Sequence, residues 1–143
     1  MSALTAVSMV DSLMSTMVPV LTLPDGLVGF PEASRFAIVE LDALGMLYRL
    51  DCIEDTTLSF VAVAPHRYRP DYSPEIDEQT VADLKLDSAD DVLLLALVTV
   101  GAKVEDAAVN LLAPIVVNRR SLRAAQVVLS GQDWPLRHPL RAG

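Results

Sequence analysis

Hydrophobic and polar residues alternate along several short stretches of the chain, which is the pattern of strands that bury one face. Residues 46–53 place Tyr48, Leu50 and Cys52 on one face of such a strand. Residues 58–64 alternate in the same way and end at a proline. Both stretches are therefore predicted to be β-strands.

Four more strands are predicted from runs of β-branched and aliphatic residues that are bounded by turn-forming residues. These strands cover residues 18–23, 35–41, 110–118 and 124–129. The turn at Pro24, Asp25 and Gly26 ends the first of them. Pro114 predicts that residues 110–118 lie at an edge of the sheet or contain a bulge, because proline has no N–H to donate to a β-ladder.

Residues 91–100 are almost continuously apolar. A run of this length predicts a central strand that is buried on both faces, and a buried helix remains the alternative. Upstream of this run, Asp77 is placed to cap a short helix over residues 78–84. Val81 and Leu84 would then point inward from the same side of that helix.

Seven strand candidates and one short helix predict an all-β fold. We expect a mostly antiparallel barrel-like structure or a pair of packed sheets, with one or two short helices. A chain of 143 residues, of which 52% are hydrophobic, suits one folded domain. We assign that domain to residues 18–143 and treat residues 1–17 as a flexible extension. Residues 101–108 are expected to form a loop, and the tail around Pro139 to lie along the surface.

The formal net charge of −8 argues against direct binding to a nucleic-acid backbone. Acidic residues gather between residues 71 and 91, where Lys85 is the one basic residue. Arginines dominate residues 119–141, where Asp133 is the one acid. The acidic stretch is interpreted either as a solvated face or as a docking surface for a basic protein, because complementary charge accelerates encounter and selects partners.

Residues with catalytic or metal-binding potential are few and scattered. His66 and His138 each lie beside a proline and belong to no zinc-binding motif. The single cysteine, Cys52, is interpreted as a buried, inert thiol, and this cysteine usage fits a reducing, intracellular setting. No serine lies in a nucleophile motif, and no apolar run approaches the roughly 20 residues of a membrane span. We therefore expect no enzymatic activity, no metal, no cofactor and no membrane insertion.

Four segments, in this order along the chain, resemble the FliW family of flagellar assembly factors. They are LPDGLVGFP at residues 23–31, DCIEDTTLSFVAVAP at residues 51–65, PDYSPEI at residues 70–76 and NLLAPIVVN at residues 110–118. The resemblance covers residues 18–140. Three positions depart from the family pattern, since Asp25 replaces a commoner glutamate, Ala108 a usual threonine and Trp134 an aromatic that is often tyrosine.

The resemblance implies a cytoplasmic, non-enzymatic protein that acts by binding other proteins and needs no cofactor. Members of the family bind newly made flagellin and also CsrA, a small RNA-binding translational repressor. When flagellin is exported, the freed factor binds CsrA away from its RNA-binding surface and relieves the repression of flagellin messenger RNA. Neither nucleic acid nor membrane is a direct partner in this scheme, and we expect a monomer. A flagellin-specific export chaperone that does not bind CsrA remains the alternative.

The candidates for the flagellin or CsrA surface, by family position, are Asn110, Pro114 and Asn118. Asp71 and Tyr72 are expected to line the same groove. The candidate electrostatic contacts for a basic partner are Asp77, Glu78, Asp87, Asp90 and Asp91. Affinity would come from an apolar centre in residues 110–118, where unpaired edge groups would accept a partner strand or helix. Alternatively, the apolar residues of this segment belong to the core; these are Leu111, Ile115 and Val117.

Overall fold

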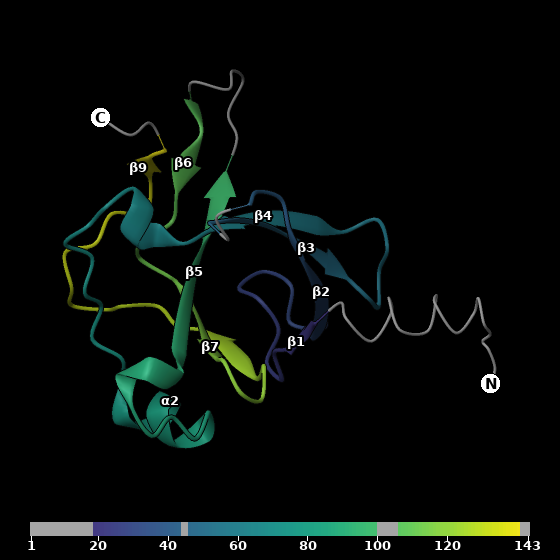
Figure 1. Ribbon diagram of the computed structural model, residues 1–143, viewed down its shortest axis with the longest axis horizontal. Helices are drawn as coiled ribbons and strands as arrows, with labels where there is room; N and C mark the ends of the chain where they lie inside the picture. Colours follow the sequence, from purple (N-terminus) through teal and green to yellow (C-terminus); the bar gives the residue numbers. More distant parts are fainter. Residues whose placement is uncertain (1–18, 44–45, 100–105, 141–143) are drawn as a thin grey trace.

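The computed structural model describes residues 19–43, 46–99 and 106–140 of the chain. The strands are β1 (Val20–Thr22), β2 (Arg35–Glu40), β3 (Leu47–Cys52), β4 (Ser59–Val63), β5 (Val92–Thr99), β6 (Ala108–Val109), β7 (Ile115–Asn118), β8 (Ala124–Gln126) and β9 (His138–Pro139). The helical elements are α2 (Glu78–Asp83) and the 3₁₀ turns η1 (Pro65–Arg67) and η2 (Ala89–Asp91). Figure 1 shows that strands are the main regular elements of this structure and that α2 lies at one end of it. The predicted extension at residues 1–17 lies outside the described residues.

Consecutive antiparallel strands from β1 to β5 form most of the sheet. The first half of β5 pairs with β7, where Leu95 lies opposite Ile115, and β7 pairs with β8. Thr22 N donates a hydrogen bond to Leu122 O at 2.9 Å, which holds the β7–β8 turn against β1. The strands thus close into a barrel-like structure, and the prediction of a mostly antiparallel all-β fold is confirmed.

β5 continues past the β7 ladder as the central strand of the molecule (Figure 1). Its second half pairs with β4, where Ala96 lies opposite Val63, and with β6, where Val98 lies opposite Val109. Leu95 and Ala96 are both fully buried, and they point to opposite sides because side chains alternate along a strand. The predicted central strand is confirmed, and the alternative of a buried helix is wrong.

Two groups of buried side chains lie on the two sides of β5. The larger group fills the barrel and includes Leu21, Phe36, Ile38, Tyr48, Leu50, Leu95, Ile115 and Val117. The second group consists of Val63, Tyr72, Ala96, Val109, Leu111 and Leu129, and Trp134 packs against it. Because burial of apolar surface is the main driving force of folding, β5 contributes to stability on both of its faces.

Residues 110–118 do not form an edge strand, so that prediction is wrong. β7 begins only at Ile115 and lies between β5 and β8. Pro114 precedes the strand, where the missing N–H interrupts no ladder. Leu111, Ile115 and Val117 are fully buried, so the alternative that assigned them to the core is correct.

The cap and the inward-facing residues of α2 are as predicted. Two short strands, in contrast, were not predicted. Asp77 caps α2, and Leu84 at its end is buried while Val81 is half-buried. β6 lies in a segment expected to be a loop, and β9 lies in the tail expected on the surface. These two strands pair with each other, with Val109 opposite His138.

Candidate protein-binding site

Two exposed acids lie at the start of α2, the N-cap Asp77 and Glu78 in the first turn. Asp77 Oδ2 accepts a hydrogen bond from Thr80 N at 3.3 Å, and Asp77 Oδ1 accepts one from Thr80 Oγ1 at 2.6 Å. The hydrogen bond from the Thr80 hydroxyl is the main reason that the pKa of Asp77 lies below its ordinary value. Glu78 follows in the first turn, where a negative charge interacts favourably with the helix dipole. The Asp77 carboxylate therefore stays charged at neutral pH, and both side chains are exposed to solvent.

The acids that follow α2 divide into structural and exposed groups. Asp91 Oδ2 accepts hydrogen bonds from Asp87 N at 3.1 Å and Ser88 N at 3.2 Å, and it lies 3.2 Å from Arg120 Nη2. The Asp91 side chain is only 17% exposed. Its hydrogen bonds to two backbone N–H groups hold this turn together. Asp87 is exposed and forms an ion pair with Arg120 at 3.1 Å, and Asp90 is also exposed.

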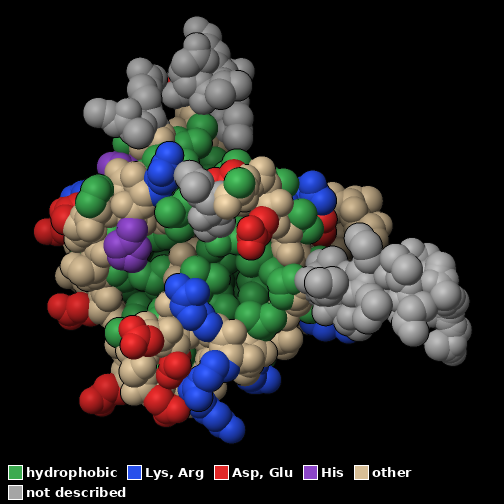
Figure 2. All heavy atoms as spheres, viewed as in Figure 1, with side chains coloured by type: hydrophobic (Ala, Val, Ile, Leu, Met, Phe, Trp, Pro, Cys, Tyr) green, Lys and Arg blue, Asp and Glu red, His purple; other side chains and the backbone are tan. Residues whose placement is uncertain are grey.

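The exposed acids of this region gather at one end of the molecule, which we call the acidic lobe. It consists of Asp77, Glu78, Asp83, Asp87 and Asp90. Figure 2 shows the corresponding concentration of red side chains at the lower left, where Figure 1 places α2. Among the described residues, Asp87 is the one member of the lobe with an ion-pair partner. The other four carboxylates present their charge to solvent.

Asn118 is buried, at 3% exposure, and connects α2 to the turn between β7 and β8. Asn118 Nδ2 donates a hydrogen bond to Leu84 O at 2.8 Å, at the end of α2. Asn118 Oδ1 accepts hydrogen bonds from Arg120 N at 2.8 Å and from Ser121 N at 3.2 Å. The side chain therefore supports the acidic lobe from inside the fold, and a direct contact with a partner stays a prediction.

Tyr72 is buried in the second apolar group, at 2% exposure. Its hydroxyl donates a hydrogen bond to Leu111 O at 2.7 Å, and burial raises the pKa of the phenol. The Tyr72 side chain therefore lies in the core of the free protein, and the expectation that it lines a partner groove stays a prediction. The neighbouring Asp71 is exposed.

Asn110 and Pro114 bracket a turn beside Tyr72. Asn110 is half-buried, and its Oδ1 accepts hydrogen bonds from Leu112 N and Ala113 N, both at 3.0 Å. Pro114 is buried. These residues build the turn that leads into β7, and their contact with a partner stays a prediction.

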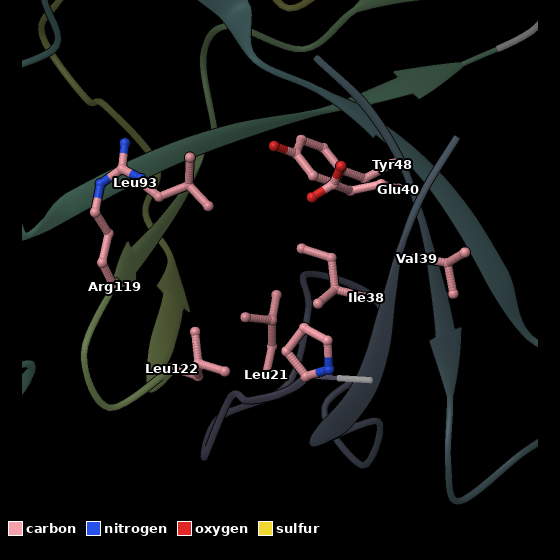
Figure 3. Close-up of a pocket in the computed structure, with 9 residues that line it drawn as sticks. Leu21, Ile38, Val39, Glu40, Tyr48, Leu93, Arg119 and Leu122 are labelled. Carbon is pink, nitrogen blue, oxygen red and sulfur yellow. The ribbon is translucent and has the colours of Figure 1, made fainter. Parts of the chain in front are cut away.

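A groove of about 520 Å³ lies between the β1–β3 part of the sheet and the turn that joins β7 to β8. We call it the apolar groove. In Figure 3, four aliphatic side chains lie around the same space, and they are Leu21, Ile38, Leu93 and Leu122. Pro19 and Val39 complete the apolar part of its lining. The groove thus combines residues from strands that are far apart in the sequence.

Polar groups lie on two sides of the apolar groove. Figure 3 shows Glu40 and Tyr48 together on one side and Arg119 on another. Arg119 Nε donates a hydrogen bond to Val92 O at 3.2 Å, and Arg119 forms no ion pair with any described carboxylate. Burial raises the pKa of Tyr48, and the Glu40 carboxylate adds to that shift. The groove therefore suits a mostly apolar segment with an acidic group near Arg119.

The family model described as "FliW protein" matches residues 8–140, which is most of the chain. The chain belongs to the FliW family. The match begins at residue 8 and not at residue 18, so the family extends further toward the start of the chain than the sequence motifs indicated.

Curated FliW relatives match the chain over most of its length. The flagellar assembly factor FliW of Treponema pallidum is 34% identical over 123 residues, which are 86% of this chain and 81% of that protein. The flagellar assembly factor FliW of Bacillus subtilis is 31% identical over 121 residues, which are 85% of each protein. A crystal structure of the flagellar assembly factor FliW superposes with a TM-score of 0.78 and 28% identity, covering 84% of each chain.

FliW relatives are named as flagellar assembly factors and do not form a known enzyme family. Within the described residues, no three His, Cys, Asp or Glu side chains are grouped to hold a metal ion. In the same part of the chain, no helix is both long enough and apolar enough to cross a membrane. The assignment to flagellar assembly rests on the FliW relationship.

Sequence reasoning found the acidic lobe of this FliW protein but missed the apolar groove. The residues that line the groove looked like ordinary strand or turn residues, because they come from segments that are far apart in the sequence: β1, β2, β3, β5 and the β7–β8 turn. One signal was present in the sequence, since Arg119 directly follows the buried strand β7 and so had to lie close to apolar residues.

Proposed function

We propose that this protein binds flagellin in the cytoplasm and also binds CsrA, so that the level of free flagellin controls CsrA activity. In this scheme the protein antagonises CsrA without competing for its RNA-binding surface. The proposal extends the FliW relationship, whose names specify flagellar assembly, to two particular partners.

The observation that carries the CsrA part of the proposal is the acidic lobe. CsrA binds RNA, and proteins that bind RNA carry basic surfaces because they must neutralise phosphates. Four carboxylates of the lobe form no ion pair within the described structure, on a chain with a net charge of −8. Such a surface steers a basic protein into an encounter and favours it over acidic competitors.

The apolar groove supports the second requirement, which is affinity. Charged rims change association rates more than they change dissociation, and most binding energy comes from buried apolar or aromatic contacts. The groove supplies such a surface through Leu93 and Leu122, with Arg119 beside them. The acidic lobe and the groove both adjoin the β7–β8 turn, through Arg120 and Arg119 respectively.

The direct test is calorimetry of the purified protein against flagellin and against CsrA from the same organism, separately and then in competition. We expect each to bind and each to exclude the other. Binding of flagellin with no binding of CsrA would support the alternative of a flagellin-specific export chaperone. Binding of neither partner would refute the proposal.

The role of the acidic lobe is tested by removing charge while keeping the helix cap. The variant Asp77→Asn/Glu78→Gln/Asp90→Asn loses three carboxylates, and asparagine still caps a helix. We expect slower association with CsrA at low salt and a shallower dependence of the rate on salt concentration. The matched control, Asp25→Asn/Glu32→Gln/Asp133→Asn, removes three exposed acids outside the lobe and should retain the wild-type salt dependence. Equal effects of both variants would show that net charge alone matters.

The relation to RNA is tested with CsrA that is already bound to a labelled RNA hairpin. Binding at a surface separate from the RNA site predicts that a ternary complex forms before RNA is released. A simple exchange, in which RNA leaves in proportion to bound protein and no ternary complex forms, would contradict this part of the proposal.

A further inference from the structure

A further cleft lies between the loop that joins β1 to β2 and the turn that joins β3 to β4. We call it the Phe30 cleft, and it is lined by Phe30, Ala33, Cys52 and Leu58 together with three acids. Ala33 and Cys52 are buried and Leu58 is half-buried, so they form an apolar floor. The cleft has a volume of about 460 Å³. It shares no lining residue with the apolar groove or the acidic lobe, and it is therefore a separate surface.

Phe30 is anchored in the fold and still exposed. Its ring packs edge-on against Phe60 with centroids 5.4 Å apart, and Phe60 packs in the same way against the fully buried Phe36 at 5.9 Å. Leu27 and Phe30 exchange backbone hydrogen bonds of 3.1 Å and 2.7 Å, which hold the loop in shape. Phe30 nevertheless stays 41% exposed, and the nearby Val28 is 65% exposed. Large apolar side chains that are exposed close together are typical of a surface that binds another molecule.

Three carboxylates line the Phe30 cleft, and no lysine or arginine of the described structure does. One of them, Glu54, forms an ion pair with Arg35 at 3.0 Å. Glu32 and Asp55 are exposed and belong to no ion pair among the described residues. Asp55 Oδ1 accepts hydrogen bonds from Thr57 Oγ1 at 2.6 Å and Thr57 N at 3.0 Å, and the hydroxyl is the main reason that the pKa of Asp55 is lowered. The cleft thus carries two formal negative charges that no described side chain neutralises.

An arginine side chain matches the floor, the ring and the acids of the cleft together. Its aliphatic stem can pack on Ala33 and Leu58. Its planar guanidinium can stack on the Phe30 ring, and its N–H groups can donate to the carboxylates of Glu32 and Asp55. A wholly apolar side chain would fill the floor but would cover these carboxylates without pairing them, which costs free energy. The charge of the cleft therefore selects a basic occupant.

We propose that the Phe30 cleft binds an arginine side chain that is carried by an apolar segment of a partner protein. The residues next to that arginine would contact Val28 and Pro31, which are exposed on either side of Phe30 in the loop. The inference goes beyond the proposed function, which assigns CsrA to the acidic lobe and the apolar groove, and it does not depend on that function.

The probes for the test are two capped pentapeptides, Gly-Leu-Arg-Leu-Gly and the same sequence with citrulline in place of arginine. Citrulline keeps the shape of the side chain and carries no charge. Each peptide is titrated into the full-length protein with isotope-labelled Ala, Leu and Val methyl groups. We expect the arginine peptide to shift the signals of Ala33 and Leu58, and the citrulline peptide to bind about fivefold more weakly. Unmoved Ala33 and Leu58 signals, or equal affinities, would overturn the proposal, and shifts confined to Val81 in α2 would assign the peptide to the acidic lobe instead.

The selecting charges are tested with Glu32→Gln/Asp55→Asn, which removes both unpaired carboxylates and keeps an Oδ1 acceptor at residue 55. This variant should bind the two peptides equally. The matched control, Asp106→Asn/Asp133→Asn, removes two exposed acids outside the cleft and should retain the preference for arginine. A preference that survives the loss of both cleft acids, or that the control also loses, would contradict selection by the cleft.

The contribution of the aromatic ring is tested with Phe30→Leu, which keeps an apolar side chain at this position. It should weaken binding of the arginine peptide more than binding of the citrulline peptide, because only a cation is attracted to the face of the ring. Equal weakening would show that the ring acts only by apolar contact and would overturn its assigned role. The methyl spectrum of each variant without peptide checks that it is folded. None of these measurements involves flagellin or CsrA, so their failure would leave the proposed function standing.

Discussion

At the scale of single residues, Gly26 is required by both its backbone angle and its surroundings. Its φ is +68°, and an added Cβ would collide with the backbone carbonyls of Phe30 and Pro31. Gly29 in the same loop has φ +87° but open space around the position of a Cβ. Gly29→Ala should therefore cost only the left-handed conformation, about 1–2 kcal/mol, and Gly26→Ala should cost clearly more. Urea unfolding of both variants checks this, and equal losses would show that the collision is relieved by a small shift of the loop.

Glu54 is the residue whose environment most clearly predicts a pH effect. Its carboxylate accepts hydrogen bonds from Arg35 Nε at 3.0 Å and Ser34 Oγ at 2.9 Å, and the Arg35 interaction contributes most to lowering its pKa from 4.5 to about 2. A depressed pKa stabilises the fold above the unfolded value and loses that contribution as the pH falls through the folded value. The stability advantage of the wild type over Glu54→Gln should thus be present at pH 6 and decline between pH 4.5 and about 2.

Thermal unfolding of the two proteins across this pH range measures the effect at Glu54. Glu32→Gln serves as the control, because Glu32 is an exposed acid outside the cluster of Glu54, Arg35 and Ser34. A difference between wild type and Glu54→Gln that stays constant from pH 6 to pH 2 would contradict the assignment of this acid.

At the scale of elements, the features that depend on local sequence were predictable. Alternation identified β3 and β4, and the capping residue Asp77 identified the start of α2. The two-residue strands β6 and β9 carry too little pattern, because their pairing depends on residues that are distant in the sequence. Pro114 was misread because proline interferes with a ladder only inside a strand, and β7 begins one residue later.

In the candidate site, too, the features set by local sequence were predictable and those set by long-range packing were not. The acidic lobe was predictable because its carboxylates lie close together in the sequence. Tyr72 was expected to line the partner groove, yet Trp134 packs on it with ring centroids 4.8 Å apart, and this contact joins segments that are far apart in the sequence. The apolar groove requires the barrel to close between β1 and the β7–β8 turn, and no local pattern specifies that closure.

Asn118 illustrates how one side chain can join two elements, and its two polar atoms can be tested separately. Asn118→Asp keeps the acceptor for Arg120 N and Ser121 N but loses the donor to Leu84 O. Asn118→Ala loses both and should cost about 1–3 kcal/mol, because buried polar groups are left unpaired. Hydrogen exchange should rise in residues 78–86 for both variants, and in residues 119–122 only for Asn118→Ala. An unchanged exchange rate in α2 would show that Asn118 does not hold that helix.

At the scale of the whole molecule, the two apolar groups are joined through one strand. Leu95 points into the barrel, and the next residue, Ala96, points into the second group that contains Tyr72 and contacts Trp134. Because both groups pack on this strand, disrupting the packing of one group should also destabilise the other. The acidic lobe and the apolar groove are attached to the same framework, since β7 pairs with β5 and ends at Asn118.

A single unfolding transition is therefore expected, and Leu95→Ala tests it. The substitution empties space in the fully buried barrel interior and should cost about 2–5 kcal/mol. Trp134, the one tryptophan, reports on the second group by fluorescence, while circular dichroism reports on all strands. Because β5 serves both groups, the two transitions should coincide in the wild type and shift together in the variant. Leu136→Ala, at a 56% exposed position in the tail near Trp134, should move neither by more than about 0.5 kcal/mol. A Trp134 transition that stays in place while the circular dichroism shifts would show that the two groups unfold independently and that β5 does not couple them.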